Sequence, residues 1–202
     1  MRITASATRV FGPDEGGFSL MELVIALAVG AILLAAMFGV FTVQHRSLNV
    51  EDQVAVLQQN VRAGMDMMVR EIRMAGFDPT GTLDTFLTAL SENVITVENV
   101  STNHDRITFY YIEGTVPKKV VYEIYSSSGV PNLGRRVDSG SIQPVVENMD
   151  GLTITYDAIA TITISLTGRT GEPDPRYTHP VHNDHYRRYT LDTTIVCRNL
   201  AL

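Results

Sequence analysis

The chain has 202 residues, a formal net charge of −6 and a single cysteine. The acidic balance and the scattered basic residues argue against nucleic acid as a direct partner. One cysteine excludes an internal disulfide, so stability must come from packing, and Cys197 is expected to be a small buried apolar residue.

The first predicted element is a membrane-spanning helix over Phe18–Val43, a run that is apolar apart from Ser19, Glu22 and Thr42. It exceeds the about 20 apolar residues that cross a bilayer. A carboxylate in hydrocarbon costs at least about 2.5 kcal/mol, so Glu22 indicates a functional site with a partner. The alternative is a carboxylate at the membrane edge that reaches back to the lipid headgroups.

The residues around Glu22 resemble a known processing signal. The stretch Gly17-Phe18-Ser19-Leu20-Met21-Glu22-Leu23-Val24-Ile25, preceded by Gly16, is similar to the signature of type IV prepilins and pseudopilins. The resemblance implies that prepilin peptidase cuts after Gly17, removing residues 1–17 as a leader, and that the new amino group of Phe18 is methylated. It also implies that Glu22 pairs with the N-terminus of a neighbouring subunit, and this pairing would reduce the desolvation cost of both charges.

The position of the cut distinguishes this segment from a secretory signal. A secretory signal is removed together with its apolar stretch, whereas here the cut would precede residues 18–43 and the helix would stay in the mature protein. Arg2, Arg9 and the amino terminus slightly outweigh Arg46, which favours a cytoplasmic N-terminus. We therefore expect a single-pass protein of the bacterial inner membrane with a periplasmic head, which later enters a filament at the cell surface.

The second predicted element, residues 44–76, is an amphipathic continuation of the helix. Its apolar residues recur at steps of three or four: Val50, Val54, Leu57, Val61, Met65, Met68 and Ile72. Gly76 and the pair Asp78-Pro79 supply a stop. The pattern predicts a continuous helix from Phe18 to Met74 whose stripe packs on the head, since two and a half repeats are too few to prefer a coiled coil.

From residue 77 to 202 the chain is predicted to form a globular β-rich head. A short helix is an alternative over Thr82–Leu90, and two long linkers are expected at Ser126–Gly140 and Gly168–His185. The predicted strands are Asn93–Val97, Arg106–Ile112, Lys119–Tyr125, Leu152–Tyr156, Thr161–Thr167 and Tyr189–Arg198. The expected fold class is α+β, type IV pilin-like, with a long N-terminal helix packed on a C-terminal antiparallel sheet.

Motifs beyond the leader resemble minor pilins of the PilW type and, more loosely, the J-type minor pseudopilins of type II secretion. These motifs are Leu57–Gly64, Arg70–Gly76, Gln143–Leu152, Thr161–Thr167 and Arg188–Asn199. The resemblance implies an accessory subunit that helps to initiate or cap a type IV pilus. Its partners would be the major pilin, other minor pilins, prepilin peptidase, the inner-membrane assembly platform and, before assembly, the lipid bilayer.

No metal or cofactor is assigned. His179, His182 and His185 could suggest zinc, but a spacing of three on a proline-containing loop does not place three rings around one point. Some pseudopilin heads hold calcium in a late loop, so Glu172, Asp174 and Asp184 are weak candidates by resemblance. These acids lack the regular spacing of a known calcium loop.

Three rival functions stay open at this point. The nearest is a minor pseudopilin at the tip of a type II secretion filament. A membrane-anchored, adhesin-like module would use the long loops of the head for binding. An anchored enzyme comes last, because no catalytic grouping is visible, although members of a triad need only be adjacent in space.

Overall fold

The computed structural model describes residues 17–157 and 160–200. They divide into two compact units, Met1–Leu48 and Asn49–Leu202. Of the expected leader, only Gly17 is among the described residues, and residues 1–16 lie outside them.

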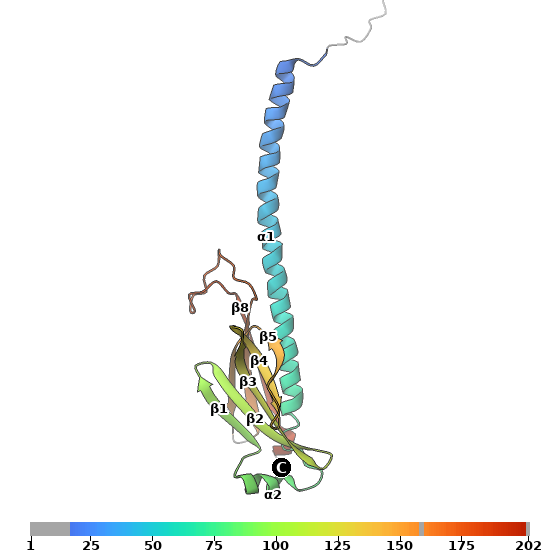
Figure 1. Cartoon of the computed structure of the whole chain (residues 1–202), viewed down its shortest axis with the longest axis vertical. Helices are drawn as coiled ribbons and strands as arrows, with labels where there is room; N and C mark the ends of the chain where they lie inside the picture. Colours follow the sequence, from blue (N-terminus) through green and yellow to red (C-terminus); the bar gives the residue numbers. More distant parts are fainter. Residues whose placement is uncertain (1–16, 158–159, 201–202) are drawn as a thin grey trace, which may run out of the picture. The chain divides into compact units, whose positions relative to one another are not determined.

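The first helix, α1 (Leu20–Ile72), is the long apolar-to-amphipathic helix that the sequence predicts (Figure 1). It begins two residues later and ends two residues earlier than expected. Its most apolar stretch has a mean hydropathy of 2.8 and none of that stretch is buried, and among the described residues it alone could span a membrane by length and composition. The exposed apolar surface is consistent with membrane anchoring.

The head consists of one sheet with short helical segments. In chain order the remaining elements are α2 (Leu83–Leu90), β1 (Ile95–Ser101), β2 (His104–Glu113), β3 (Val116–Ser127), β4 (Val130–Val137), β5 (Gln143–Glu147), β6 (Met149–Tyr156), β7 (Thr161–Arg169), β8 (Arg188–Val196) and the 3₁₀ turn η1 (Arg198–Leu200). Within the described residues eight strands pair in the order β5-β4-β3-β2-β6-β7-β8, with β1 on β2. All pairs are antiparallel except β2 with β6, which touch in parallel only at His104 and Leu152.

The expected α+β class is therefore confirmed, and the six predicted strands and the short helix are present within a few residues of their predicted bounds. The prediction of a linker over Ser126–Gly140 is wrong, because β4 lies within these residues. Its Ser and Gly residues mark only the ends of the strand, while Val130–Val137 pairs with β3 along its whole length. The sequence prediction also omitted β5, which pairs with β4 through Pro144 and Val146.

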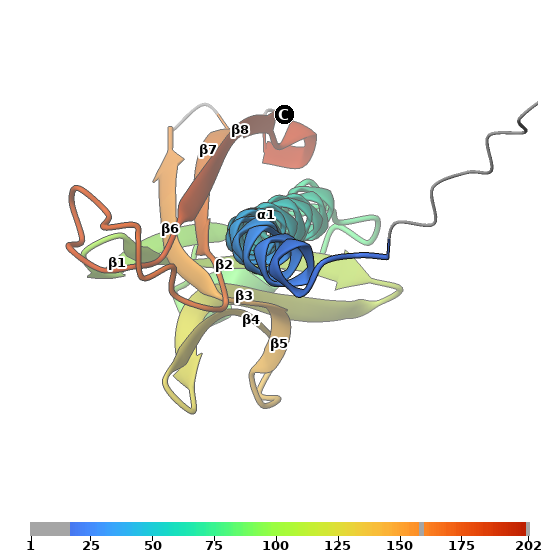
Figure 2. The same ribbon diagram turned by 90° about the horizontal axis from the view of Figure 1, so that it is seen from above.

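The core forms where the apolar stripe of α1 meets the sheet. The stripe residues Leu57, Val61, Met65, Met68 and Ile72 are buried, as predicted. Contact is close at two glycines. A Cβ added at Gly64 of α1 would lie 3.3 Å from side-chain atoms of β4, β5 and β7, and one added at Gly168 of β7 would lie 2.7 Å from Leu57 and Val61. Seen along the helix, the strands bend around this part of α1 (Figure 2).

The C-terminal segment closes the core at the end of α1. The Cys197 thiol is fully buried, as expected, and donates a hydrogen bond to the Ile72 carbonyl oxygen at 3.4 Å. Burial raises the pKa of this thiol, which favours the neutral form. The Asn199 amide donates to the carbonyl oxygens of Arg73 and Ala75, so η1 satisfies backbone acceptors that the helix end leaves open.

Candidate functional site

The start of α1 contains a capping box at the predicted processing site. The Ser19 side-chain oxygen accepts a hydrogen bond from the Met21 N–H at 3.3 Å, and the Glu22 carboxylate accepts one from the Ser19 N–H at 3.0 Å. Two of the N–H groups that a helix start leaves without partners are thereby satisfied. Gly17 and Phe18 precede the cap in non-helical conformation, so the expected scissile bond lies outside the helix.

Glu22 thus has a partner within its own chain. The expected pairing of Glu22 with the amino group of a neighbouring subunit stays a prediction. The local signal for the cap was present in the sequence, because Ser19 and Glu22 have the S-x-x-E spacing of a capping box. A carboxylate in the first turn is also favoured by the positive end of the helix dipole.

The surface that follows the cap is apolar on all sides. Phe18 is 90% exposed, and large apolar side chains remain exposed along the helix through Val43. A helix that is apolar all round belongs in a core or a membrane rather than in water. This segment therefore requires an apolar environment, such as lipid or the apolar surface of another protein.

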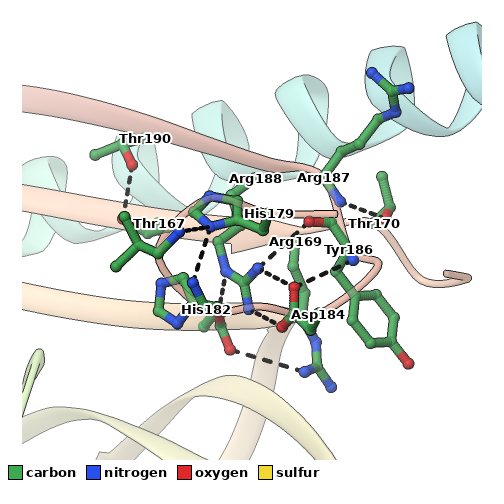
Figure 3. Close-up of polar contacts among 12 residues, drawn as sticks. Thr167, Arg169, Thr170, His179, His182, Asp184, Tyr186, Arg187, Arg188 and Thr190 are labelled. Atoms are coloured by element: carbon green, nitrogen blue, oxygen red, sulfur yellow. Dashed lines mark hydrogen bonds and ion pairs between the residues drawn. The ribbon is translucent and has the colours of Figure 1, made fainter. Parts of the chain in front are cut away.

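A second polar site lies at the far end of the sheet from α2, in the loop that joins β7 to β8 (Figure 1). Arg188 organises it. Its guanidinium donates to both carboxylate oxygens of Asp184 at 2.7 Å and to Asp150 at 2.5 Å (Figure 3). The hydrogen bonds from Arg188 hold the pKa of Asp184 well below its usual range, and those carboxylates raise the pKa of Arg188.

Further contacts order the rest of this loop. Arg187 pairs with Asp174 at 2.9 Å and lies over the Tyr177 ring, and Arg169 lies over the Tyr186 ring. Thr170 and Arg187 exchange backbone and side-chain hydrogen bonds where the two strands separate. The long loop predicted over Gly168–His185 is present, and charge pairs and ring contacts define its conformation.

These contacts decide where the predicted metal candidates lie. Asp174 and Asp184 each face an arginine, and Glu172 lines a separate groove beside α1. His179 and His182 are close, with ring centroids 4.9 Å apart, whereas the His185 ring contacts the Tyr177 carbonyl oxygen. In the part of the chain that the structure describes, no three His, Cys, Asp or Glu side chains are grouped as a metal site.

Two pairs of adjacent arginines, Arg135-Arg136 and Arg187-Arg188, each contain one member whose side chain is mostly buried in an ion pair. The Arg188 side chain is only 8% exposed. Arg135 donates to Glu71 at 2.8 Å, and the same carboxylate accepts from the Tyr122 hydroxyl at 2.7 Å. Burial and the contact with Glu71 raise the pKa of Tyr122, so the phenol remains a donor. Sequence patterns carry no signal for such distant pairing.

Comparison with known proteins identifies the N-terminal segment. Residues 13–38 match the family described as the prokaryotic N-terminal methylation motif, a stretch that includes Gly17, Phe18 and Glu22. No curated protein and no solved structure gives a significant match. The motif indicates a type IV pilin-like prepilin that is processed and methylated.

Proposed function

Because residues 13–38 carry the methylation motif of pilin-like prepilins, we propose that the mature chain is a minor pilin that helps to initiate type IV pilus assembly. Prepilin peptidase cuts after Gly17 and Phe18 is N-methylated. The observation that carries the proposal is this motif at the head of a helix whose apolar side chains are exposed. Such a helix can leave the bilayer only for another apolar environment, which neighbouring subunits provide.

The accessory role rests on the motifs of the second unit. The PilW-like stretches of the sequence lie on α1, β5, β6, β7 and β8, all of which contribute apolar side chains to the core or pack against it. A few copies of such a subunit would present their apolar helices to the first major pilins. The inner-membrane assembly platform and other minor pilins are the further partners that this role requires.

Intact-mass analysis tests the processing step. The protein purified from cells with prepilin peptidase should begin at Phe18 and carry one additional methyl group, whereas cells without the enzyme should retain residues 1–17. A mature chain that begins at any other residue contradicts the proposal.

Two substitutions separate the cap from the intersubunit charge pair. Glu22→Gln keeps an acceptor for the Ser19 N–H but removes the charge, and Glu22→Ala removes both. If the charge pair directs assembly, both variants should be processed normally and both should fail to restore pili in a deletion strain. Normal pilus numbers with Glu22→Gln would show that capping alone accounts for the carboxylate.

Deletion of the gene distinguishes an assembly role in pili from one in secretion. The proposal expects fewer surface filaments at unchanged levels of major pilin, with normal export of secreted enzymes. Normal piliation combined with failed export would instead assign the chain to a type II secretion filament, as the looser J-type resemblance allows.

A further inference from the structure

A polar cleft of about 270 Å³ lies on the face of the sheet that points away from α1. Its floor consists of hydroxyl side chains from three adjacent strands: Thr153 of β6, Ser165 and Thr167 of β7, and Thr190 of β8. Its walls are Asn103 from the β1–β2 turn and the imidazoles of His179 and His182 from the long loop. Figure 3 shows the Thr167–Thr190 hydroxyl pair and, on the side of Thr167, the two imidazole rings.

Strand register explains why the hydroxyls gather. Thr153 is opposite Ser165, and Thr167 is opposite Thr190, so alternate residues of three strands present hydroxyl groups on one face. The Thr167 and Thr190 hydroxyls are 2.8 Å apart and hydrogen-bond to each other. The loop then adds a wall at one end of this face, which turns a flat surface into a cleft.

The charged groups that line the cleft, Asp150 and Arg188, belong to a network of ion pairs. Arg188 is shared between Asp150 and Asp184, and Arg169 lies 3.9 Å from Asp150. Two cations and two carboxylates therefore cancel, and the guanidinium of Arg188 is nearly inaccessible. An anionic ligand would have to displace a carboxylate from Arg188, and a metal ion would have to compete with arginine for each carboxylate.

The remaining lining supplies hydrogen-bond donors and acceptors from hydroxyls, one amide and two imidazole rings. We propose that the cleft binds one unit of a neutral saccharide, whose ring hydroxyls exchange hydrogen bonds with the floor. The volume lies just below the about 300–1,000 Å³ of typical small-molecule pockets, which suits a single sugar ring of a longer glycan. The His179 Nδ1 atom already accepts hydrogen bonds from the Val181 and His182 N–H groups, so the carbon atoms of the imidazole rings are the surface against which a sugar ring packs.

The sheet itself provides a matched control. Thr163 and Thr194 form the same kind of cross-strand pair, with hydroxyls 3.1 Å apart, on the same face of β7 and β8. Thr163 lies four residues before Thr167 on β7, and Thr194 lies four residues after Thr190 on β8. This second pair is therefore about 13 Å from the first and does not line the cleft. Thr→Val is nearly isosteric and suits a strand, so all four variants should fold.

The test uses the full chain in lauryldimethylamine oxide micelles, because this detergent has no sugar headgroup to compete. Saturation-transfer NMR titrations with maltose, cellobiose and N,N′-diacetylchitobiose should show saturable binding of at least one disaccharide. Thr167→Val and Thr190→Val should each weaken that binding about five-fold through the lost hydroxyl. His182→Ala should weaken it as well, while Thr163→Val and Thr194→Val should leave it unchanged.

Three results would overturn the proposal. The first is absence of saturable binding by all three disaccharides. The second is binding of sulfate in place of sugar, which would make the cleft an anion site. The third is equal loss in the Thr163→Val and Thr167→Val variants. Binding is measured on the purified chain, so failure here leaves the assembly role untouched, and failure of that role leaves this result standing.

Discussion

Arg188 joins parts of the head that are distant in sequence. It contacts Asp184 within the loop and Asp150 on β6, and its side chain is almost completely buried. A bidentate guanidinium–carboxylate contact fixes both position and orientation, which a lysine at this place could not reproduce. The conformation of the loop therefore depends on the ionised form of Asp184.

Stability should consequently depend on pH through Asp184. The folded-state pKa of Asp184 is depressed by Arg188, so the unfolded chain binds this proton at a higher pH than the folded chain does. The contribution is complete above the unfolded pKa of about 4 and is lost as pH falls below it. The Tm gap between the unmodified protein and Asp184→Asn should be largest near pH 7 and shrink below about pH 4.

Asp192→Asn is the control for this experiment, because it removes an exposed acid from β8 outside the Arg188 network. Thermal unfolding followed by near-ultraviolet circular dichroism gives the Tm at each pH. A gap between unmodified protein and Asp184→Asn that stays constant from pH 7 to pH 3 would contradict the assigned ion pair.

At the scale of elements, the close contact between α1 and β7 depends on a glycine, which has no side chain. Gly168 lies directly beneath Leu57 and Val61, close enough that a Cβ would overlap both. The helix and the strand therefore approach more closely than two larger residues would allow. This is a packing role, since no left-handed backbone conformation is recorded for this glycine.

Gly168→Ala should destabilise the head by about 1–3 kcal/mol through overpacking. Gly151→Ala is the matched control, because Gly151 is also a strand glycine but a Cβ there would meet its nearest atom at an ordinary 3.4 Å. Urea unfolding at neutral pH measures both variants. Equal stability of Gly168→Ala and Gly151→Ala would show that α1 shifts at little cost.

At the scale of the whole molecule, the two units have opposite requirements. The unit that ends at Leu48 exposes apolar side chains in its described part, whereas the unit from Asn49 onward contains the buried core. All buried residues of α1 lie between Leu57 and Ile72. The unit from Asn49 onward, which is the C-terminal part of α1 together with the head, therefore has its own hydrophobic core.

Deletion of residues 1–48 should accordingly yield a soluble, folded head. The chain from Asn49 to Leu202 should be monomeric in size-exclusion chromatography without detergent, and should unfold cooperatively with a Tm close to that of the full chain in micelles. Aggregation, or loss of cooperative unfolding, would mean that the N-terminal unit contributes to the fold of the head.

Local sequence patterns were sufficient to predict the N-terminal helix and its motif. The apolar run, Glu22 and the spacing of three and four along α1 are short-range features, so sequence alone predicted the helix, its buried stripe and the processing motif. Alternation likewise predicted the strands with one solvent-exposed face, such as β7, expected over Thr161–Thr167 and observed over Thr161–Arg169. Where the pattern of residues within a helix or strand defines its buried face, that element can be predicted without knowing which other elements it packs against.

Tertiary structure decided the features that depend on partners far along the chain. The sequence of β4 reads as a linker because its stability comes from pairing with β3 and β5. Arg188 and Asp150 are 38 residues apart, and the cleft joins Asn103 to His182 and Thr190. Such contacts depend on the register of the sheet and on the conformation of a loop. Neither produces a periodic pattern or a fixed residue spacing in the sequence.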